Sequence, residues 1–524
     1  MSNGASDAAR GPAGAPAVPP PLAGIALAIT SLALALGTFM QVLDGSIANV
    51  SLPTIAGNLG VSTDNGTWVI TSFACANGVT VPLTGWLMAR FGVVRTFCVA
   101  VLAFTVTSLL CGIAWSLPSL IIFRLLQGAC SGPMIPGSQA LLIAIFPPHK
   151  RGTALSIWSM TTLTAPVMGP VLGGYISDNY HWGWIFLINV PVGLIAGFIS
   201  WRSLKDRETP TRRLPIDTVG LVLLAFWVFS LQTMLDLGKD RDWFNNSLIV
   251  GLAICAVVGF VAWMIWELTD KQPAVDLALF KGRNFSFGVL ALCLGYALLF
   301  ANNLLLPLWL QQYMGYTATW AGLVAAPSGM VAVAMTPLIG RLSGIDARWL
   351  ATTAFVSYAG SFFLRSHYTP DASFWTLTFP LLLQGVAMST FFVPLLNISF
   401  DGIRPEKIPS ASGISNFARI TAGSFAASII TTYWDRREAL HQSRITESGT
   451  IFSPIYNQAI EQLQQFGFSP QQAAGAVYRQ VIDQAYLLSS IELFWICGWM
   501  AVVMIPVIWL CRRPAPSAVV HAAD

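Results

Sequence analysis

The sequence predicts an all-α membrane protein that crosses a bilayer fourteen times, as two six-helix bundles with two further helices inserted between them. Three observations lead to this fold. The 524 residues are 55% hydrophobic and only 10% charged, whereas soluble domains carry about 25% charged residues. Apolar stretches of about 20 residues, the length that a helix needs to span the hydrocarbon core, recur along the chain. Short motifs of the first half also return in the second half.

Dividing the chain at charged residues and at clusters of Gly, Pro, Asn and Asp gives the fourteen predicted spans. They lie near residues 24–53, 65–89, 95–115, 118–146, 153–177, 183–203, 217–237, 247–267, 285–313, 318–341, 348–365, 373–400, 409–433 and 487–511. The predicted regions are a disordered tail (1–23), a six-helix bundle (24–204), the two inserted helices (217–268), a second six-helix bundle with an outer loop at 434–486 (284–511), and a second tail (512–524).

The internal repeat supports the division into two bundles. Pro82–Leu87 is echoed by Pro337–Leu342, and Gln127-Gly128 is echoed by Gln384-Gly385, at offsets of 255 and 257 residues. Parallel repeats of this kind occur in alternating-access carriers, which bind substrate between the two halves near the middle of the membrane.

The distribution of basic residues predicts that both termini are cytoplasmic. With the N-terminus inside, 19 Lys and Arg fall on the cytoplasmic side and 7, including Arg365, on the outer side, in line with the positive-inside rule. The N-terminal tail matches a signal peptide poorly, because it has a single basic residue and no convincing cleavage site. We therefore expect the first span to remain in the protein.

Asp44 is the first candidate site residue. It follows an uncharged run from Gly11 to Leu43 and lies about nine residues, roughly 13 Å, below the outer end of the first span near Leu52. Arg124 lies at a similar depth in the fourth span, about six residues or roughly 9 Å below its outer end. A charge inside a span is costly and indicates function, and buried opposite charges usually pair. Protonation of Asp44 would then free Arg124. The alternative is that the helix ends at Leu43 and Asp44 lies in a surface turn.

Other polar residues within spans are weaker candidates. We expect Glu492, near the outer start of the last span, to be a second proton site, because all five histidines fall in loops or tails. The remaining polar residues either line a central cavity or form interhelical hydrogen bonds worth around 0.6 kcal/mol each. They are Asn49, Gln127, Asn302, Asn303, Gln384, Asn397, Asn416 and Arg419.

The fifth span combines glycine and proline over Ala165–Gly174. Glycine lets helices approach closely in lipid, and proline interrupts the hydrogen-bond ladder. This segment is therefore either a hinge that takes part in gating or a purely structural packing seam. The long outer loop at 434–486 is polar and rich in Gln, with a helix-like pattern around residues 460–466. A loop of this length is usually functional, so it is either a docking surface or a helical lid over the last spans.

Several functional classes lack their signatures. The sequence has no phosphate-binding GxxxxGK[ST] loop, no Cys/His metal spacing and no nucleophile-elbow serine. The eight cysteines fall in or beside apolar segments, so we expect no disulfide, no metal site and no cofactor. Basic residues are scattered among loops, which argues against nucleic-acid binding. Transport driven by an ion gradient remains.

Six motifs resemble those of the fourteen-spanning drug:proton antiporters of the major facilitator superfamily. The first-span and span-five motifs are the most specific, and the span-five motif marks exporters rather than importers. The six are Leu43–Pro53, Arg124–Gly128, Gly169–Gly174, Gly85–Gly92, Thr67–Phe73 and Trp184–Pro191. The last two, with the long loop before the final span, are most similar to the EmrB-like proteins.

This resemblance, which runs from about residue 37 to 511, implies the major facilitator fold and a set of roles. EmrB-like proteins are inner-membrane subunits of tripartite pumps that work with a periplasmic membrane-fusion adaptor and an outer-membrane channel and expel hydrophobic compounds. It implies proton coupling by Asp44 and Arg124. It implies gating by the span-five motif and by the motif between spans two and three, through Gly169, Pro170, Gly173, Gly174, Gly85, Arg90 and Gly92. Ala89 stands where the latter motif usually carries an acidic residue, so Arg90 and Arg95 are expected to pair elsewhere.

The sequence thus predicts a proton-coupled exporter of amphipathic or hydrophobic toxic compounds in a bacterial inner membrane, in contact with lipid. Within transporters the alternative is a narrow exporter, for example of a fatty acid or a siderophore. A protein of the same fold that senses ligands without moving them is a further alternative, although a buried Asp44 would bring it no benefit. The substrate is not specified by the sequence.

Overall fold

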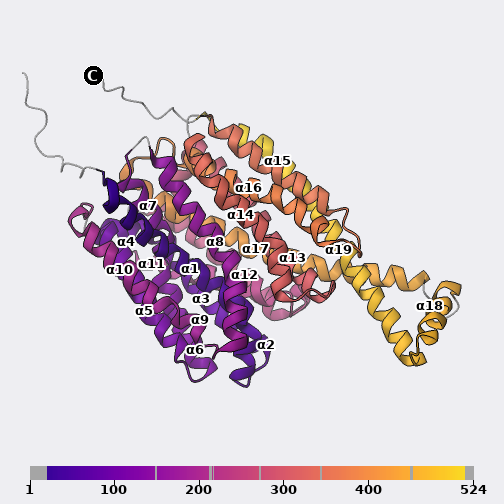
Figure 1. The fold of residues 1–524 in the computed structure, drawn as a ribbon. Coiled ribbons are helices and arrows are strands. Elements are labelled where there is room, and N and C mark those ends of the chain that lie inside the picture. Colours follow the sequence, from indigo (N-terminus) through magenta and orange to yellow (C-terminus); the bar gives the residue numbers. More distant parts are fainter. Residues whose placement is uncertain are drawn as a thin grey trace, which may run out of the picture.

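The computed structural model describes residues 21–147, 150–211, 215, 217–270, 273–342, 345–448 and 453–513. All regular secondary structure in these residues is helical, which confirms the predicted all-α fold. Figure 1 shows the first bundle in indigo to purple and the second in salmon to yellow, lying side by side. The predicted tails fall almost entirely outside the described residues.

The first bundle contains ten helical segments that correspond to the first six predicted spans. They are α1 (Gly24–Asn58), α2 (Thr63–Gly66), α3 (Trp68–Thr80), α4 (Thr84–Phe91), α5 (Val93–Gly112), α6 (Leu117–Ser131), α7 (Met134–Ile145), α8 (Arg151–Asn179), α9 (Trp184–Leu187) and α10 (Asn189–Leu204).

Three of these spans consist of two consecutive helices rather than one. The second span breaks between α3 and α4 at Pro82, and the fourth breaks between α6 and α7 at Gly132-Pro133. Proline has no backbone N–H and its ring clashes with the preceding turn, which explains both breaks. The sixth span breaks at Ile188, before Asn189.

The remaining predicted spans correspond to eight helices, and one further helix lies in the outer loop. The inserted pair is α11 (Thr218–Leu237) and α12 (Ser247–Thr269). The second bundle contains α13 (Arg283–Gln312), α14 (Ala318–Arg341), α15 (Ala347–Arg365), α16 (Phe374–Phe400), α17 (Ile408–Ser448), α18 (Pro454–Gln465) and α19 (Pro470–Trp509).

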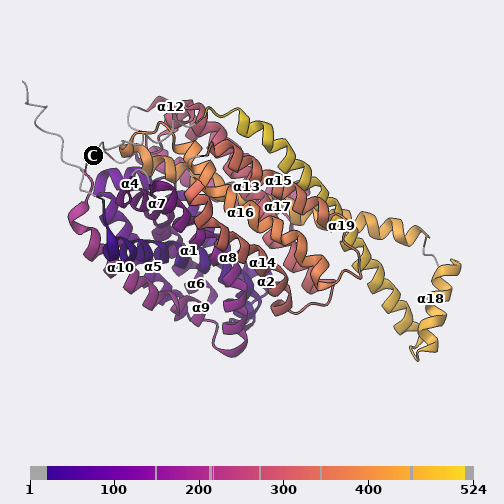
Figure 2. The ribbon, with the colours of Figure 1, turned by 45° about the horizontal axis from the view of Figure 1, so that its top comes forward.

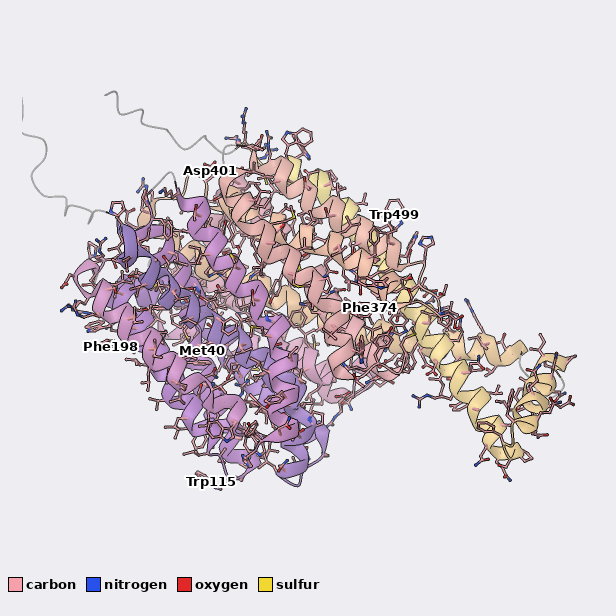
Figure 3. All side chains as sticks on the ribbon, viewed as in Figure 1. Met40, Trp115, Phe198, Phe374, Asp401 and Trp499 are labelled. Atoms are coloured by element: carbon pink, nitrogen blue, oxygen red, sulfur yellow. The ribbon has the colours of Figure 1, made fainter. Side chains whose placement is uncertain are left out.

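Nine of the described helices are each long and apolar enough to cross a membrane. Large apolar side chains also point outward from the bundles, as lipid contact requires. Phe198, Trp115 and Trp499 are 70%, 76% and 49% exposed, and Figure 3 shows all three at the edge of the molecule. The molecule is therefore a multi-pass membrane protein.

Of the two inserted helices, α11 touches both bundles. Trp227 of α11 lies against Phe417 of α17, with ring centres 5.8 Å apart, while its neighbour Val228 packs against Gly78 of α3. The bundles also meet directly, along α8 and α14 (Figure 2) and where α4 and α7 contact α17. The seam formed by α4, α7 and the first turns of α17 lies at the end of the molecule where α1 begins and α19 ends.

The outer loop predicted at 434–486 is mostly helical, and its helix-like pattern around residues 460–466 falls in and directly after α18. α17 continues to Ser448 and α19 already begins at Pro470, so both helices extend well beyond the predicted spans. With α18 they form an arm that projects from the opposite end of the molecule to the start of α1 (Figure 1). Ser469 and Gln472 form a capping box at the start of α19, a helix-start signal that hydropathy does not detect.

Aromatic side chains fix the base of this arm. The rings of Tyr313 and Tyr486 stack with centres 3.9 Å apart, and Trp434 packs edge-on against Tyr486 at 4.8 Å. The Trp434 indole N–H also donates to Ser490 Oγ at 2.9 Å. These contacts join α13, α17 and α19 where the arm leaves the second bundle.

Candidate functional site

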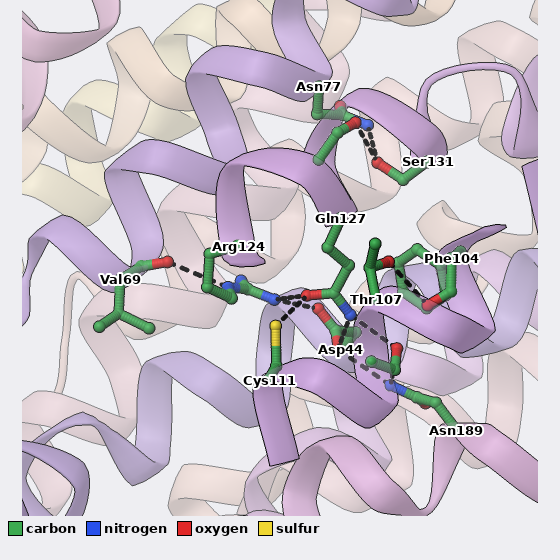
Figure 4. Close-up of polar contacts among 12 residues, drawn as sticks. Asp44, Val69, Asn77, Phe104, Thr107, Cys111, Arg124, Gln127, Ser131 and Asn189 are labelled. Atoms are coloured by element: carbon green, nitrogen blue, oxygen red, sulfur yellow. Dashed lines mark hydrogen bonds and ion pairs between the residues drawn. The ribbon is translucent and has the colours of Figure 1, made fainter. Parts of the chain in front are cut away.

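The interior of the first bundle contains a buried ion pair between Asp44 of α1 and Arg124 of α6 (Figure 4). Arg124 Nη1 lies 2.5 Å from Asp44 Oδ2, and the two side chains are 1% and 0% exposed. The two charges therefore meet, as their estimated depths predicted. Because α1 continues to Asn58, the alternative of a surface turn at Asp44 is excluded.

Neutral side chains satisfy the second oxygen of the Asp44 carboxylate. Oδ1 accepts hydrogen bonds from Gln127 Nε2 at 3.0 Å and from Asn189 Nδ2 at 2.9 Å. Bonds to an ionised acceptor are roughly twice as strong as neutral ones. Three donors from α6 and α10 thus stabilise the charged form of Asp44.

Arg124 is held on several sides. Its Nη1 also donates to Gln127 Oε1 at 2.7 Å, and its Nε donates to the carbonyl of Val69 in α3 at 3.0 Å. The guanidinium carbon lies 4.2 Å from the ring centre of Phe73, within the range of a cation–π interaction. Its position is therefore set by α1, α3 and α6 together.

The spacing in Arg124-Leu125-Leu126-Gln127 explains how one helix supplies two of these groups. Residues three apart on a helix share a face, so Arg124 and Gln127 both point inward, whereas Leu125 and Leu126 are each 44% exposed. Gln127 Nε2 also donates to Ser108 Oγ of α5 at 2.7 Å. Gln127 therefore contacts both members of the ion pair and ties them to α5.

Asn189 and Ser108 were not among the predicted site residues. Asn189 has an amide side chain inside a predicted span. The same signal selected Asn302, so Asn189 could have been predicted from the sequence. Ser108 gave no such signal, because serine is common in membrane helices. Only the packing of α5 against α6 brings its hydroxyl to Gln127.

The predicted span-five motif lies in α8, against the segment of α1 that carries Asp44. A Cβ atom added to Gly169 would lie 2.5 Å from Ser46 Cβ, and one added to Gly173 would lie 3.1 Å from Ile47 Cγ1. Gly174, by contrast, faces open space. Pro170 belongs to α8, but its side chain lies outside the described part of the structure.

The motif between spans two and three contacts the second bundle through Gly85. A Cβ atom there would lie 2.7 Å from Ser410 Cα in α17, so only glycine permits this approach between α4 and α17. Gly92 has a φ of 93°, in the left-handed region that favours glycine. Arg90 lies over the rings of Trp86 and Phe91, 5.3 and 5.6 Å from their centres.

This motif has Ala89 where an acidic residue is usual. An acidic residue from elsewhere in the chain, Glu208, lies against the end of the motif instead. The Glu208 carboxylate accepts from the backbone N–H groups of Val94 at 3.0 Å and Arg95 at 2.9 Å. A negative charge at a helix N-terminus is stabilising. Glu208, just after α10, therefore anchors the start of α5.

The second bundle contains a related cluster without a carboxylate. Asn302, 258 positions after Asp44, accepts from Arg365 Nη1, and Gln384, the repeat partner of Gln127, accepts from Arg365 Nη2. Arg365 was counted on the outer side, as the last residue of the predicted span 348–365. It ends α15, as it ends the predicted span, but its side chain is buried, with 0% exposure. It lies 257 positions after Ser108.

The remaining predicted residues are scattered. Asn49 and Asn303 have exposed side chains and Asn397 is half-buried, whereas Asn416 and Arg419 are buried and bonded to each other. Glu492 lies at the base of the arm rather than alone in the membrane. Arg437 Nε lies 2.5 Å from one oxygen of its carboxylate, and His441 Nε2 lies 3.2 Å from the other.

Comparison with known proteins identifies the family. Residues 34–427 match the model of the Major Facilitator Superfamily. The chain belongs to the major facilitator superfamily.

Relatives and solved structures agree with this assignment. The chain is 48% identical over 496 residues to the Multidrug export protein EmrB of Escherichia coli strain K12, covering 94% of this chain and 97% of the relative. It is 46% identical over 499 residues to the Fatty acid resistance protein FarB of Neisseria gonorrhoeae, covering 95% and 98%. The crystal structure of the human organic anion transporter MFSD10 matches with a TM-score of 0.57 at 12% identity, over 92% and 99% of the two chains.

The predicted EmrB-like resemblance and the major facilitator fold are thus confirmed. The match at 12% identity supports the fold alone. As a member of this superfamily the chain is a transporter rather than an enzyme. The roles assigned above to individual residues stay predictions.

The close packing of α8 on α1 predicts that replacing Gly169 or Gly174 by alanine changes the stability of the protein in opposite directions. We expect Gly169→Ala to destabilise the protein by about 1–3 kcal/mol, because the added methyl group overlaps Ser46. Gly174→Ala should be neutral or stabilising by up to about 1 kcal/mol, because alanine favours helix and the site is open. Thermal unfolding of the purified variants measures both. Equal melting temperatures would contradict the packing account.

Proposed function

We propose that this protein expels hydrophobic and amphipathic toxic compounds from the cytoplasm in exchange for protons, as the inner-membrane subunit of a tripartite multidrug pump. The observation that carries the proposal is the buried Asp44–Arg124 pair. Export is supported by the names of the relatives, which concern multidrug export and fatty acid resistance. The glycine seam between α1 and α8 is formed by the motif that resembles the span-five motif of exporters, and it packs on the segment of α1 that carries Asp44.

Proton coupling follows from the chemistry of the pair. Asp44 is the only carboxylate that contacts Arg124 within the described part of the chain. A proton on Asp44 removes the negative charge that holds Arg124 in place, whereas Arg124 itself stays protonated. The link between α1 and α6 therefore depends on whether Asp44 is charged. The neighbouring turn of α1, at Ser46, packs against Gly169 of α8. A proton entering from outside would favour one arrangement of the bundles, and its release to the cytoplasm would favour the other.

The transport experiment compares Asp44→Asn with the parent protein in inside-out vesicles or proteoliposomes. Under an imposed proton gradient we expect substrate accumulation to fall at least about tenfold in the variant, a barrier change of about 1.4 kcal/mol or more. Exchange of labelled for unlabelled substrate at equal pH should persist, because it requires no net proton movement.

Glu492→Gln is the matched comparison. The sequence predicted a second proton site at Glu492, but we propose that it is not one, because its carboxylate pairs with Arg437 and His441 at the base of the arm. The substitution should leave gradient-driven transport within about twofold of the parent. Normal accumulation by Asp44→Asn would rule out Asp44 as the coupling residue. Loss of both accumulation and exchange would indicate a folding defect, which the melting temperature checks, because removing one member of a buried ion pair costs about 3–5 kcal/mol.

The proposed tripartite assembly is supported by the arm. It projects from the end opposite to the start of α1, and its tip exposes Ile455 by 79%, Phe466 by 83% and Phe468 by 44%. Apolar side chains gathered on an exposed projection are typical of protein–protein contacts. With both termini cytoplasmic, this arm lies in the periplasm, where an adaptor would reach it.

The double substitution Ile455→Asp and Phe466→Asp tests this contact. We expect drug resistance of intact cells to fall severalfold, because charged residues at the tip disrupt an apolar interface. Transport in vesicles, where no adaptor is needed, should remain unchanged. Unchanged resistance at normal protein levels would argue against docking at the tip.

A further inference from the structure

Arg419 of α17 is a buried cation that the proposed proton pathway does not use. Its side chain is 3% exposed and lies where the two bundles meet. The guanidinium carbon is 4.5 Å from the ring centre of Tyr296 in α13 and 5.4 Å from that of Phe392 in α16. From the first bundle, Trp158 of α8 approaches to 5.9 Å.

The guanidinium of Arg419 is only partly satisfied. Nη2 donates to Asn416 Oδ1 at 2.8 Å, whereas Nη1 is buried without a hydrogen-bond partner among the described residues. No described carboxylate forms an ion pair with it. The other two interior arginines differ, because Arg124 has a carboxylate and Arg365 donates to Asn302, Gln384 and Ser361.

Two further N–H donors beside this cation also lack partners within the described residues. Trp158 Nε1 and Gln139 Nε2 are buried and unbonded, and their side chains are 1% and 0% exposed. Gln139, in α7, lies next to the same network, because its Oε1 accepts from Asn416 Nδ2 at 3.2 Å. Three unsatisfied donors, one of them charged, therefore lie on Arg419, on the Trp158 ring near it, and on Gln139, which is joined to Arg419 through Asn416.

Physical chemistry indicates what would complete this arrangement. A buried polar group without a partner costs about 1–3 kcal/mol, and more when it is charged. A cation inside a membrane protein is a functional-site hypothesis by default. Donors without acceptors require an acceptor from outside the chain, and the charge of Arg419 favours a planar anion such as a carboxylate.

We propose that Arg419, with Trp158 and Gln139, binds the anionic head group of the transported substrate. The substrates of this site are then amphipathic organic anions, whose apolar bodies lie against the rings of Tyr296, Phe392 and Trp158. This assignment deepens the proposed export function and rests on it. Because the donors come from α7 and α8 on one side and α17 on the other, an anion held between them links substrate binding to the relative position of the bundles.

Binding of two matched probes tests the assignment. Purified full-length protein in lipid nanodiscs is titrated with dansyl-labelled undecanoate and with its methyl ester, which differ only in the charge of the head group. We expect the parent protein to bind the acid about tenfold more tightly than the ester, equal to about 1.4 kcal/mol. Arg419→Gln should bind both probes alike, whereas Arg419→Lys should keep most of the preference because the charge remains.

A second substitution guards against a folding defect in Arg419→Gln. Trp158→Phe keeps the aromatic ring but removes the N–H donor, and should lower the acid preference by about threefold. Equal binding of acid and ester by the parent, or an undiminished acid preference in both Arg419→Gln and Trp158→Phe, would overturn the inference.

The titration uses no proton gradient, so its result is separable from the transport test. An acid preference that depends on Arg419 supports the inference even if gradient-driven efflux fails, a failure that would contradict the proposed function alone. Proton-driven efflux without any acid preference would contradict the anion site alone.

Discussion

The ion pair between Asp44 and Arg124 is the interaction on which the first bundle depends. Neither charge can lose its partner without a bare ion remaining in a low-dielectric interior, a penalty of several kcal/mol. Gln127, Asn189 and Ser108 complete the network, so α1, α5, α6 and α10 are held in one arrangement by a single group of side chains. A proton on Asp44 would change its contacts with Arg124, Gln127 and Asn189. This makes a titratable ion pair suitable for coupling a gradient to a movement of helices.

The two halves keep the repeat but distribute charge differently. Gln127 and Gln384 are repeat partners, but Gln127 donates to Asp44 whereas Gln384 accepts from Arg365, which also donates to Asn302. The first bundle therefore pairs a titratable acid with its cation, whereas the second holds a cation among neutral acceptors. In this account the first bundle handles the proton, and the second bundle contributes fixed positive charge, including Arg419 at the junction.

The sequence predicted more of the ion pair than of its surroundings. Asp44 and Arg124 were found because a charge within an apolar run is conspicuous and helical rise converts position into depth. The end of the span at Arg365 was predicted correctly, but the burial of its side chain was not, because the polar residues Ser366 and His367 follow it directly. The arm was missed as continuous helix because polar helices carry no hydropathy signal. Its stability comes from contacts distant in sequence, such as Tyr313 against Tyr486. The cap by Glu208 and the unsatisfied donors around Arg419 depend on tertiary packing alone.

The central claim is that Asp44 gives up or takes up a proton when the transporter changes state, and proton release on substrate binding tests it most directly. Concentrated, weakly buffered protein in detergent is mixed with a substrate that has no titratable group, and the pH change is followed with an indicator dye. The account predicts release of protons on substrate binding by the parent protein, and no release by Asp44→Asn that still binds the substrate. Equal proton release by the variant would contradict the account and assign the coupling to another group.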